Sequence, residues 1–396
     1  MTTTEPTTPT ETRHPSRWLA VAAVTFGTFL LVTAEQLPIG LLTDVGSALT
    51  VSVGMAGLMV TVTSIVAGLA APIVPVLVGK MDRRLLLVGL MGLMTIANVG
   101  SALAPNFPVL MASRALVGGA IGGFWAVAGG LAVRLVAPAH VPRATAVIFG
   151  GVGAANVLGV PIGTVLGDLA DWRIAFGALS GLAFVVLIAL LSVLPPLAAS
   201  QPVGPRQLAD QFRNPGVRAG ILATFAIVTG HFAAYTFVSP VLQDMSGVDG
   251  RLIGPLLFGF GLAGIAGNFI AGAAVARRLH RTVLVIVGAL AAAILLFPLL
   301  GLTAPGGITL LIVWGLVFGG VSVSLQTWMI KAAPQAVEAA SALWVSMFNL
   351  AIGLGAFAGG VIVDATALPG VLWLGGASVA AAGLAVWSVR AVTALR

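Results

Sequence analysis

Twelve long apolar segments run through this chain of 396 residues and constrain its fold more than any other feature. One such segment can cross a membrane, because about 20 helical residues rising ~1.5 Å each cover the ~30 Å hydrocarbon core. Apolar residues make up 59% of the chain and charged residues 8%, so a soluble domain of this length could not bury its apolar surface. The sequence therefore predicts an all-α, multi-pass membrane protein. We expect spans at 18–42, 53–78, 85–104, 107–134, 141–167, 173–194, 217–241, 251–276, 282–302, 306–331, 336–363 and 369–390.

The breaks between the segments divide the chain into two halves of six spans. The one long break, residues 195–216, contains five prolines. We expect a six-helix bundle at 18–194, a cytoplasmic linker at 195–216 and a second six-helix bundle at 217–392. Residues 1–17 are polar and rich in Thr and Pro, which predicts a disordered cytoplasmic N-terminus.

The basic residues predict the orientation. If the N-terminus is cytoplasmic, all but three of the 19 Lys and Arg residues lie in cytoplasmic segments, and the exceptions are Arg114, Arg173 and Arg251. Cytoplasmic loops of membrane proteins carry such an excess. We therefore expect both termini on the cytoplasmic side of the cell inner membrane. The net charge of +7 then reflects topology, and it does not indicate a nucleic-acid partner.

An internal repeat lies on this layout, with an offset of 196 residues. Two parallel six-helix repeats, related by an axis along the membrane normal, form the halves of a carrier that alternates its access. A channel has no need of this pairing. The matched pairs include Ala137-Pro138 with Ala333-Pro334, Gly159 with Gly355, Gly163 with Gly359, and Asp168 with Asp364.

Three ionisable residues inside the expected spans are the candidates for proton coupling: Glu35, Arg114 and His231. A charged group inside a membrane is costly, and such residues commonly serve transport or proton relay. Glu35 is the leading proton-titrating group, and His231 lies one repeat offset after it. Each residue also has a structural explanation. Glu35 could be a hydrogen-bonded carboxyl near the outer interface, Arg114 could extend its side chain to this interface, and His231 could be a core histidine with one hydrogen bond.

A set of aromatic and amide side chains could form the surface that binds a solute. Flat rings with amide donors and acceptors suit a planar, neutral, polar molecule, although each residue alone is as well explained by packing. The candidates are Trp125, Asn156, Phe232, Tyr235, Gln326, Trp328, Trp344 and Asn349.

Glycines spaced by four in the fifth expected span let a neighbouring helix approach closely. Gly159 and Gly163, with Pro161 between them, are therefore candidates for gating, and simple packing is the alternative.

The stretches AEQLPIGLLTDV, MDRRLLL, GGFWAV and TGHFAAYTFVSPV, with twelve spans and a long central loop, resemble the major facilitator superfamily. The resemblance covers about residues 18–392. It points to the drug:proton antiporter-1 exporters and, among them, to the bacterial purine ribonucleoside efflux pumps. It implies that Asp82 and Arg83 latch the two halves on the cytoplasmic side, and that Arg114 tunes proton transfer with Glu35.

We therefore expect a proton-coupled secondary transporter that exports a small organic solute, with purine ribonucleosides as the first candidate. A drug or sugar exporter of the same subfamily and a proton-coupled importer remain open. We expect a monomer in the lipid bilayer that is not an enzyme and uses no cofactor beyond the proton gradient. The chain has no cysteine and no P-loop, which argues against a thiolate metal site and an ATP-driven pump.

Overall fold

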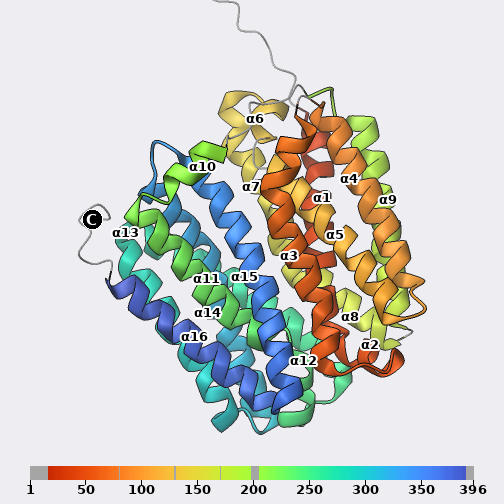
Figure 1. The fold of residues 1–396 in the computed structure, drawn as a ribbon, viewed down its shortest axis with the longest axis vertical. Helices are drawn as coiled ribbons and strands as arrows, with labels where there is room; N and C mark the ends of the chain where they lie inside the picture. The colour runs from red at the N-terminus through yellow and green to blue at the C-terminus, as the bar shows by residue number, and fades with distance from the viewer. Residues whose placement is uncertain (1–16, 80, 129–130, 170, 198–204, 389–396) are drawn as a thin grey trace, which may run out of the picture.

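The computed structural model describes residues 17–79, 81–128, 131–169, 171–197 and 205–388. The segment expected to be disordered, residues 1–17, lies outside this part except for its last residue. Helices make up the fold, and the described residues contain no strand (Figure 1). The predicted all-α class is confirmed.

The first half is built from nine α-helices and two short η segments, a 3-10 turn and a π-helix. They are α1 (Trp18–Gly40), α2 (Leu42–Ala48), α3 (Val53–Val78), α4 (Arg83–Ala102), α5 (Phe107–Ala128), α6 (Ala132–Leu135), η1 (Pro138–His140), α7 (Val141–Ala154), the π-helix η2 (Ala155–Gly159), α8 (Val160–Leu169) and α9 (Trp172–Val193).

The second half follows the short helix α10 (Pro205–Gln211), which lies in the expected linker. Its elements are α11 (Pro215–Tyr235), α12 (Val238–Pro240), the π-helix η3 (Val241–Met245), η4 (Gly250–Leu252), α13 (Ile253–Leu300), α14 (Ala304–Ala332), α15 (Val337–Ala365) and α16 (Leu368–Ser388).

Ten helices of the described chain are long and apolar enough to cross a membrane. The longest of these candidates, Gly250–Leu300, covers two expected spans, and the non-helical backbone of Arg278 (φ −146°, ψ 66°) separates two helices within α13. The apolar part of α16, Leu368–Leu384, is shorter than these ten candidates and is not one of them. The count of twelve spans depends on this division and on α16, and it stays a prediction.

The two sets of helices lie side by side in Figure 1, with α1 to α9 in one bundle and α11 to α16 in the other. Across the boundary α3 packs against α15, and α8 packs against α13. We call the end that carries α6 and α10 the basic end, and the end that carries α2 and α12 the opposite end (Figure 1). The arrangement agrees with two repeats that face each other.

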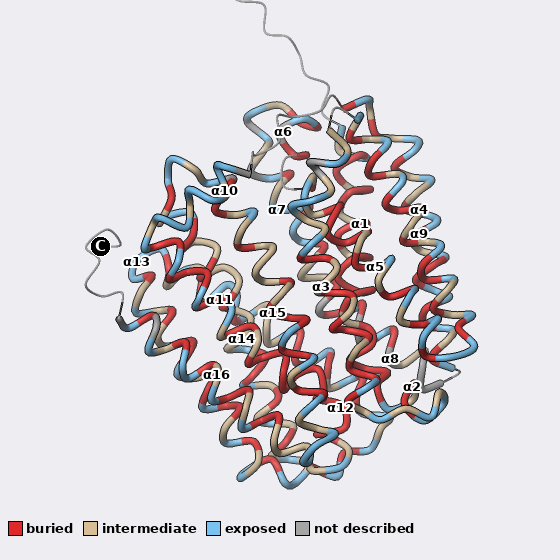
Figure 2. The backbone as a smooth tube through the Cα atoms, viewed as in Figure 1, coloured by how far each residue is buried: buried red, intermediate tan, exposed pale blue. Residues whose placement is uncertain are grey.

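Burial separates an inner surface from an apolar outer one (Figure 2). The helix α1 is buried along most of its length. Large apolar side chains elsewhere are exposed, such as Phe269 at 73% and Leu384 at 71%. Soluble monomers rarely expose so many, whereas a lipid bilayer covers them.

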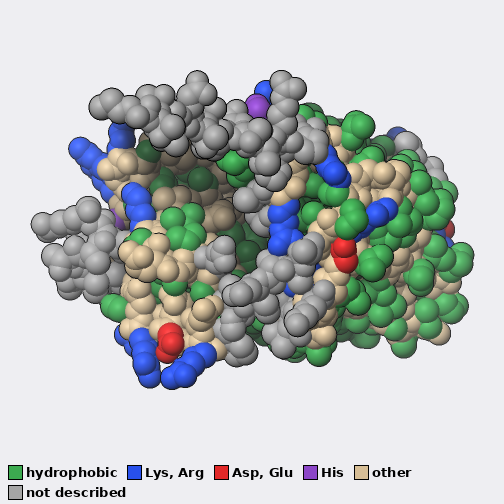
Figure 3. Space-filling view, turned by 90° about the horizontal axis from the view of Figure 1, so that it is seen from above, with side chains coloured by type: hydrophobic (Ala, Val, Ile, Leu, Met, Phe, Trp, Pro, Cys, Tyr) green, Lys and Arg blue, Asp and Glu red, His purple; other side chains and the backbone are tan. Residues whose placement is uncertain are grey.

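The halves touch at the opposite end and part at the basic end. At the opposite end Ser52 donates to Asp364 at 2.5 Å, and Ser239 donates to the carbonyl of Ile39 at 3.2 Å. Deeper along α3, Ser346 donates to the carbonyl of Gly68 at 2.9 Å. Figure 3, viewed onto the basic end, shows a hollow between the two halves. The two halves are therefore closed against each other at the opposite end and separated at the basic end.

Candidate transport site

Glu35 lies inside the first half, on α1, and its side chain is buried. Ser64 of α3 donates a hydrogen bond to its Oε1 at 3.1 Å, and among the described residues this hydroxyl is the one hydrogen-bond partner of the carboxyl. A carboxylate in an apolar site is stable only with several donors or a counter-charge, whereas a protonated carboxyl needs fewer. With one described hydroxyl partner, the side chain of Glu35 is not part of a larger hydrogen-bond network.

Pro38 explains why an arginine binds the backbone beside Glu35. A proline inside a helix has no N–H for the carbonyl four residues earlier, which here belongs to Ala34. Arg114 of α5 fills this position, since its Nη2 donates to the Ala34 oxygen at 2.6 Å. The guanidinium is thus fixed one residue away from the carboxyl.

Arg114 is buried completely and keeps unused donors. Its Nε and Nη1 have no hydrogen-bond partner, and its guanidinium lies 5.6 Å from the ring centre of Phe176. The ion pairs between described residues do not include Glu35 with Arg114. A small movement of α1 against α5 could pair the two, and the ion pair would then stabilise the deprotonated carboxylate.

Glycines bring α5 close enough to α3 for this arrangement. A side chain at Gly118 would collide with the carbonyl of Thr63, and one at Gly122 with that of Ala67. The hydroxyl of Thr63 donates to the carbonyl of Arg114 at 3.2 Å. The backbone contact therefore positions Arg114 next to the helix that carries Ser64.

His231 lies in the second half, on α11, and is buried completely within an aromatic cluster. The indole Nε1 of Trp314 donates to its Nδ1 at 2.9 Å, and Nε2 has no partner. The ring stacks on Phe318 with 3.4 Å between centroids and 6° between planes. The other rings around it are Phe232, Tyr235 and Phe260.

The two sites occupy corresponding places in the two halves. Glu35 and His231 are one repeat offset apart, and so are Ser64 and Phe260. Glu35 is surrounded by α1, α3 and α5, and His231 by α11, the first part of α13, and α14. The same scaffold position is polar and charged in the first half, and aromatic in the second.

The other expected solute-binding residues do not form one group. Phe232 and Tyr235 join the His231 cluster. Trp328 instead donates to the carbonyl of Gly216 at 3.0 Å and lies beside His280, near the basic end. Among the remaining candidates, Trp125 contacts Phe149 and Trp344 contacts Phe348. Asn349 donates to the carbonyl of Val345 in its own helix, and Gln326 is half-buried. The side chain of Asn156 is not among those that the structure describes.

Asp82 binds within its own half of the protein. It caps α4 by accepting the Arg84 N–H at 2.7 Å, and it also accepts the N–H of Leu197 at 3.0 Å. The backbone of Arg83 donates to the carbonyl of Leu197 at 2.9 Å. Both contacts fix the segment that follows α9. The described contacts of Asp82 and Arg83 do not reach the second half, and the latch between the halves stays a prediction.

The glycines of the fifth expected span face α1. A side chain at Gly159 would collide with Thr33, and one at Gly163 with Leu37. Gly159 ends the π-helix η2, and Pro161 lies in the first turn of α8. A π-helix loosens the backbone and is common at functional sites, so the stretch suits a moving contact. Its role in gating stays a prediction.

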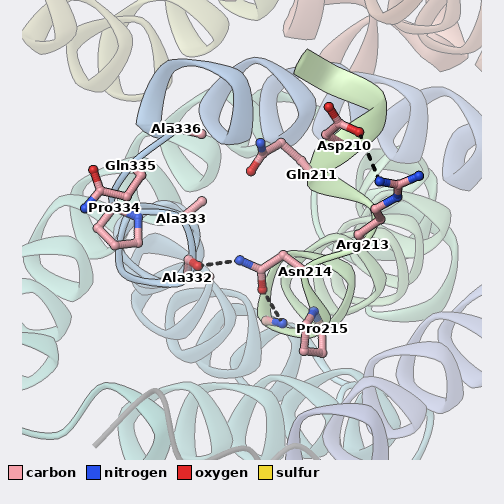
Figure 4. Close-up of a pocket in the computed structure, with 11 residues that line it drawn as sticks. Asp210, Gln211, Arg213, Asn214, Pro215, Ala332, Ala333, Pro334, Gln335 and Ala336 are labelled. Carbon is pink, nitrogen blue, oxygen red and sulfur yellow. Dashed lines mark hydrogen bonds and ion pairs between the residues drawn. The ribbon is translucent and has the colours of Figure 1, made fainter. Parts of the chain in front are cut away.

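A surface pocket at the basic end lies apart from both buried sites (Figure 4). It is lined by residues of the α10–α11 and α14–α15 connections. Asn214 donates to the carbonyl of Ala332 at 2.7 Å and accepts the N–H of Gly216 at 2.9 Å, while Arg213 pairs with Asp210 at 3.7 Å. Part of the lining is thus fixed by bonds among the residues of these connections, and neither Glu35 nor His231 belongs to it.

Sequence reasoning missed Ser64, Phe260, Trp314 and Phe318. A serine in an apolar span carries no signal of its own. The aromatic pair does carry one, because Trp314 and Phe318 are four residues apart and share a helix face. The repeat offset from Ser64 leads to Phe260 in the same way.

These observations define a membrane carrier of two related helical halves, with one buried site in each. The sequence model described as the Major Facilitator Superfamily matches residues 24–340, and the chain belongs to this superfamily of transporters.

Relatives align over most of the chain. A purine ribonucleoside efflux pump, NepI, of Escherichia coli is 33% identical over 364 residues, 91% of each protein. A protein of Pseudomonas aeruginosa named transcription regulatory protein OpdE is 35% identical over 353 residues, 88% of each. The crystal structure of the human organic anion transporter MFSD10 superposes with a TM-score of 0.67 at 17% identity, over 94% of this chain and all of that one. This last likeness concerns the fold alone.

Proposed function

We propose that the protein is a proton-coupled secondary transporter that exports a small organic solute from the cytoplasm, with purine ribonucleosides as the first candidate. The observation that carries the coupling is the geometry of Glu35, a buried carboxyl with a single hydroxyl partner. Arg114, which has two unused donors, is hydrogen-bonded to the carbonyl of Ala34, the residue before Glu35. The name of the Escherichia coli relative supports the solute class.

The proposed cycle uses the two ends of the molecule in turn. The distribution of basic residues favours a cytoplasmic position for the basic end, so that the hollow opens to the cytoplasm. A solute enters there, the halves rock, and the opposite end opens outward. A proton that enters from outside neutralises Glu35 and favours the return, since a neutral carboxyl tolerates a closed apolar site.

Transport in proteoliposomes under an imposed pH gradient tests this function. Labelled inosine or guanosine should accumulate against its gradient when the vesicle lumen is acidic and the protein is inserted with its basic end outward. Glu35→Gln should abolish this accumulation while exchange between equal pools continues, because the amide keeps a hydrogen bond to Ser64 but cannot titrate.

Asp44→Asn provides the matched control, because Asp44 is an acid in the short helix α2, outside the spans. Full accumulation by the Glu35→Gln protein would end the coupling proposal. Accumulation of a hydrophobic drug or a sugar, with no purine ribonucleoside transported, would keep the coupling and replace the solute.

A further inference from the structure

The imidazole of His231 is held in its neutral form by a neighbouring group that can donate a hydrogen bond but cannot accept one. An indole N–H only donates, and it donates to Nδ1 of His231 at 2.9 Å. A protonated imidazole has an N–H at both nitrogens and could not accept this bond. The contact with Trp314 therefore requires a lone pair on Nδ1, and the ring proton lies on Nε2.

The described ring contacts and ion pairs bring no charged side chain against the imidazole of His231. Its described ring contacts are Phe232, Tyr235, Phe260, Trp314 and Phe318. Among these side chains Tyr235 alone is titratable, and it stacks on the imidazole at 5.0 Å and 18°. These ring contacts come from α11, α13 and α14. This environment suits a neutral ring and opposes a charged one.

The Nε2–H is left without an acceptor. It is buried and has no hydrogen-bond partner. A buried donor in this state lowers stability, and most buried polar groups in proteins are satisfied. An aromatic residue of similar size would fill the same space without this cost. An unpaired donor among flat rings is the arrangement expected of a site that is completed by a ligand.

We propose that His231 is a specificity-determining donor for the transported solute, and not a proton carrier. Its Nε2–H binds an acceptor atom of a planar heteroaromatic ring system, such as a ring nitrogen or the carbonyl of a purine. The aromatic side chains around it provide the stacking surface. This inference rests on the proposed function and deepens it, because it assigns proton coupling to the first half and solute recognition to the second.

Histidine NMR tests the neutral state without any solute. The chain contains four histidines. The signal that disappears from the spectrum of a His231→Gln protein is the signal of His231. We expect the ¹⁵N shifts of His231 to report the Nε2–H tautomer throughout the range of about pH 6 to 8, where an ordinary histidine titrates. An imidazolium signal in this range would overturn the inference.

Solute counterflow without a pH gradient tests the donor role. Glutamine keeps an N–H near the position of Nε2, whereas phenylalanine keeps the ring and loses the donor. The half-saturating concentration should stay within a few fold for His231→Gln and rise about tenfold for His231→Phe, as expected when one buried polar partner is left unpaired. Equal values for both variants would contradict the donor role.

Purine analogues provide a second measurement that does not depend on the folding of any variant. In the wild-type protein, one of the 3-deaza, 7-deaza or 6-deoxo analogues should bind about tenfold more weakly than its parent, because it lacks the acceptor. His231→Phe should transport parent and analogue alike. If every analogue matches its parent in the wild-type protein, the proposed recognition is wrong.

Gradient-driven accumulation separates this inference from the proposed function. His231→Gln should still concentrate solute against its gradient, with the shifted half-saturation found in counterflow, while Glu35→Gln should not concentrate it at all. Loss of accumulation by His231→Gln with counterflow intact would make His231 a proton carrier and overturn the inference alone. A wild-type protein that transports no purine ribonucleoside would refute the proposed solute, and the NMR result would still decide the protonation state.

Discussion

The carboxylate of Asp364 accepts the backbone N–H of Gly54 at 3.1 Å, across the boundary between the two halves. It also accepts the hydroxyl of Ser52, which is itself the N-cap of α3 and accepts the N–H of Met55. An acid of the second half thus lies at the N-terminus of a helix of the first half. A negative charge there interacts favourably with the helix dipole, by about 0.3–1 kcal/mol.

Asp364→Asn should open the opposite end more often, because it removes the charge from this contact. The chain has no cysteine, so Ala56→Cys, at a position of α3 that is fully buried, gives a clean reporter. We expect a membrane-impermeant maleimide to label this cysteine several-fold faster in the Asp364→Asn background, since hydrogen bonds to charged groups contribute about 1.5–3 kcal/mol.

Asp249→Asn is the matched control for Asp364→Asn. Asp249 is an exposed acid at the same end, and in the described part of the chain its side chain accepts only the nearby N–H of Arg251. Its substitution should leave labelling unchanged. Equal labelling rates for Asp364→Asn and the unsubstituted reporter protein would show that Asp364 does not hold the halves together.

Gly159→Ala should lower the thermal stability of the purified protein. The added methyl group would meet Thr33 of α1, and overpacking of this kind costs about 1–3 kcal/mol. Gly153→Ala, on the same helical stretch, meets nothing within 4 Å and should be neutral or gain up to about 1 kcal/mol from helix propensity. A Gly159→Ala protein as stable as Gly153→Ala would place the contact with α1 in doubt.

Asp82→Ala should destabilise the first half, because the backbone N–H groups of Arg84 and Leu197 both lose their acceptor when the carboxylate is removed. Loss of a helix cap costs about 0.5–2 kcal/mol. Differential scanning fluorimetry would measure the lowered Tm. Asp210→Ala, an exposed acid paired with Arg213 at the basic end, is the control and should change little. Unchanged stability with slowed turnover would instead favour the latch implied by the family resemblance.

The sequence indicated the buried charges well, because a charge inside an apolar span is conspicuous. Glu35 and Arg114 are both buried, and the repeat offset from Glu35 leads to His231 in the corresponding place of the second half. The pattern could not show that Ala34, whose carbonyl loses its helical partner at Pro38, is the acceptor for Arg114. That pairing depends on how closely α5 approaches α1.

Single side chains were harder to place than helices. Trp328 looks like a candidate for solute binding, yet its indole is fixed to the carbonyl of Gly216 near the basic end. Leu197 follows the last helix of the first half, and its binding by Asp82 depends on a chain reversal that no local pattern encodes. The two expected spans around Arg278 are joined in α13, because only this residue departs from helical backbone.

Pro38→Ala should release Arg114 from the backbone of α1. The new N–H at position 38 would bond to the carbonyl of Ala34 within the helix, in competition with the Arg114 Nη2 that binds there at 2.6 Å. Arg114 would then lose its one described side-chain hydrogen bond while remaining buried. We expect gradient-driven transport to fall about tenfold, in line with the loss of a hydrogen bond from a charged group. Solute exchange between equal pools should fall less, because Arg114 acts on proton coupling.

Pro298→Ala is the control for this prediction, since Pro298 lies inside α13 and no described side chain is hydrogen-bonded to the carbonyl four residues before it. It should leave transport unchanged and raise the Tm slightly as a helical bond is gained. Two further results decide the role of the pairing. A Pro38→Ala protein with full gradient-driven transport would show that the fixed position of Arg114 is unnecessary for coupling. Equal losses of transport in both proline variants would trace the effect to helix flexibility, because only α1 has an arginine on the freed carbonyl.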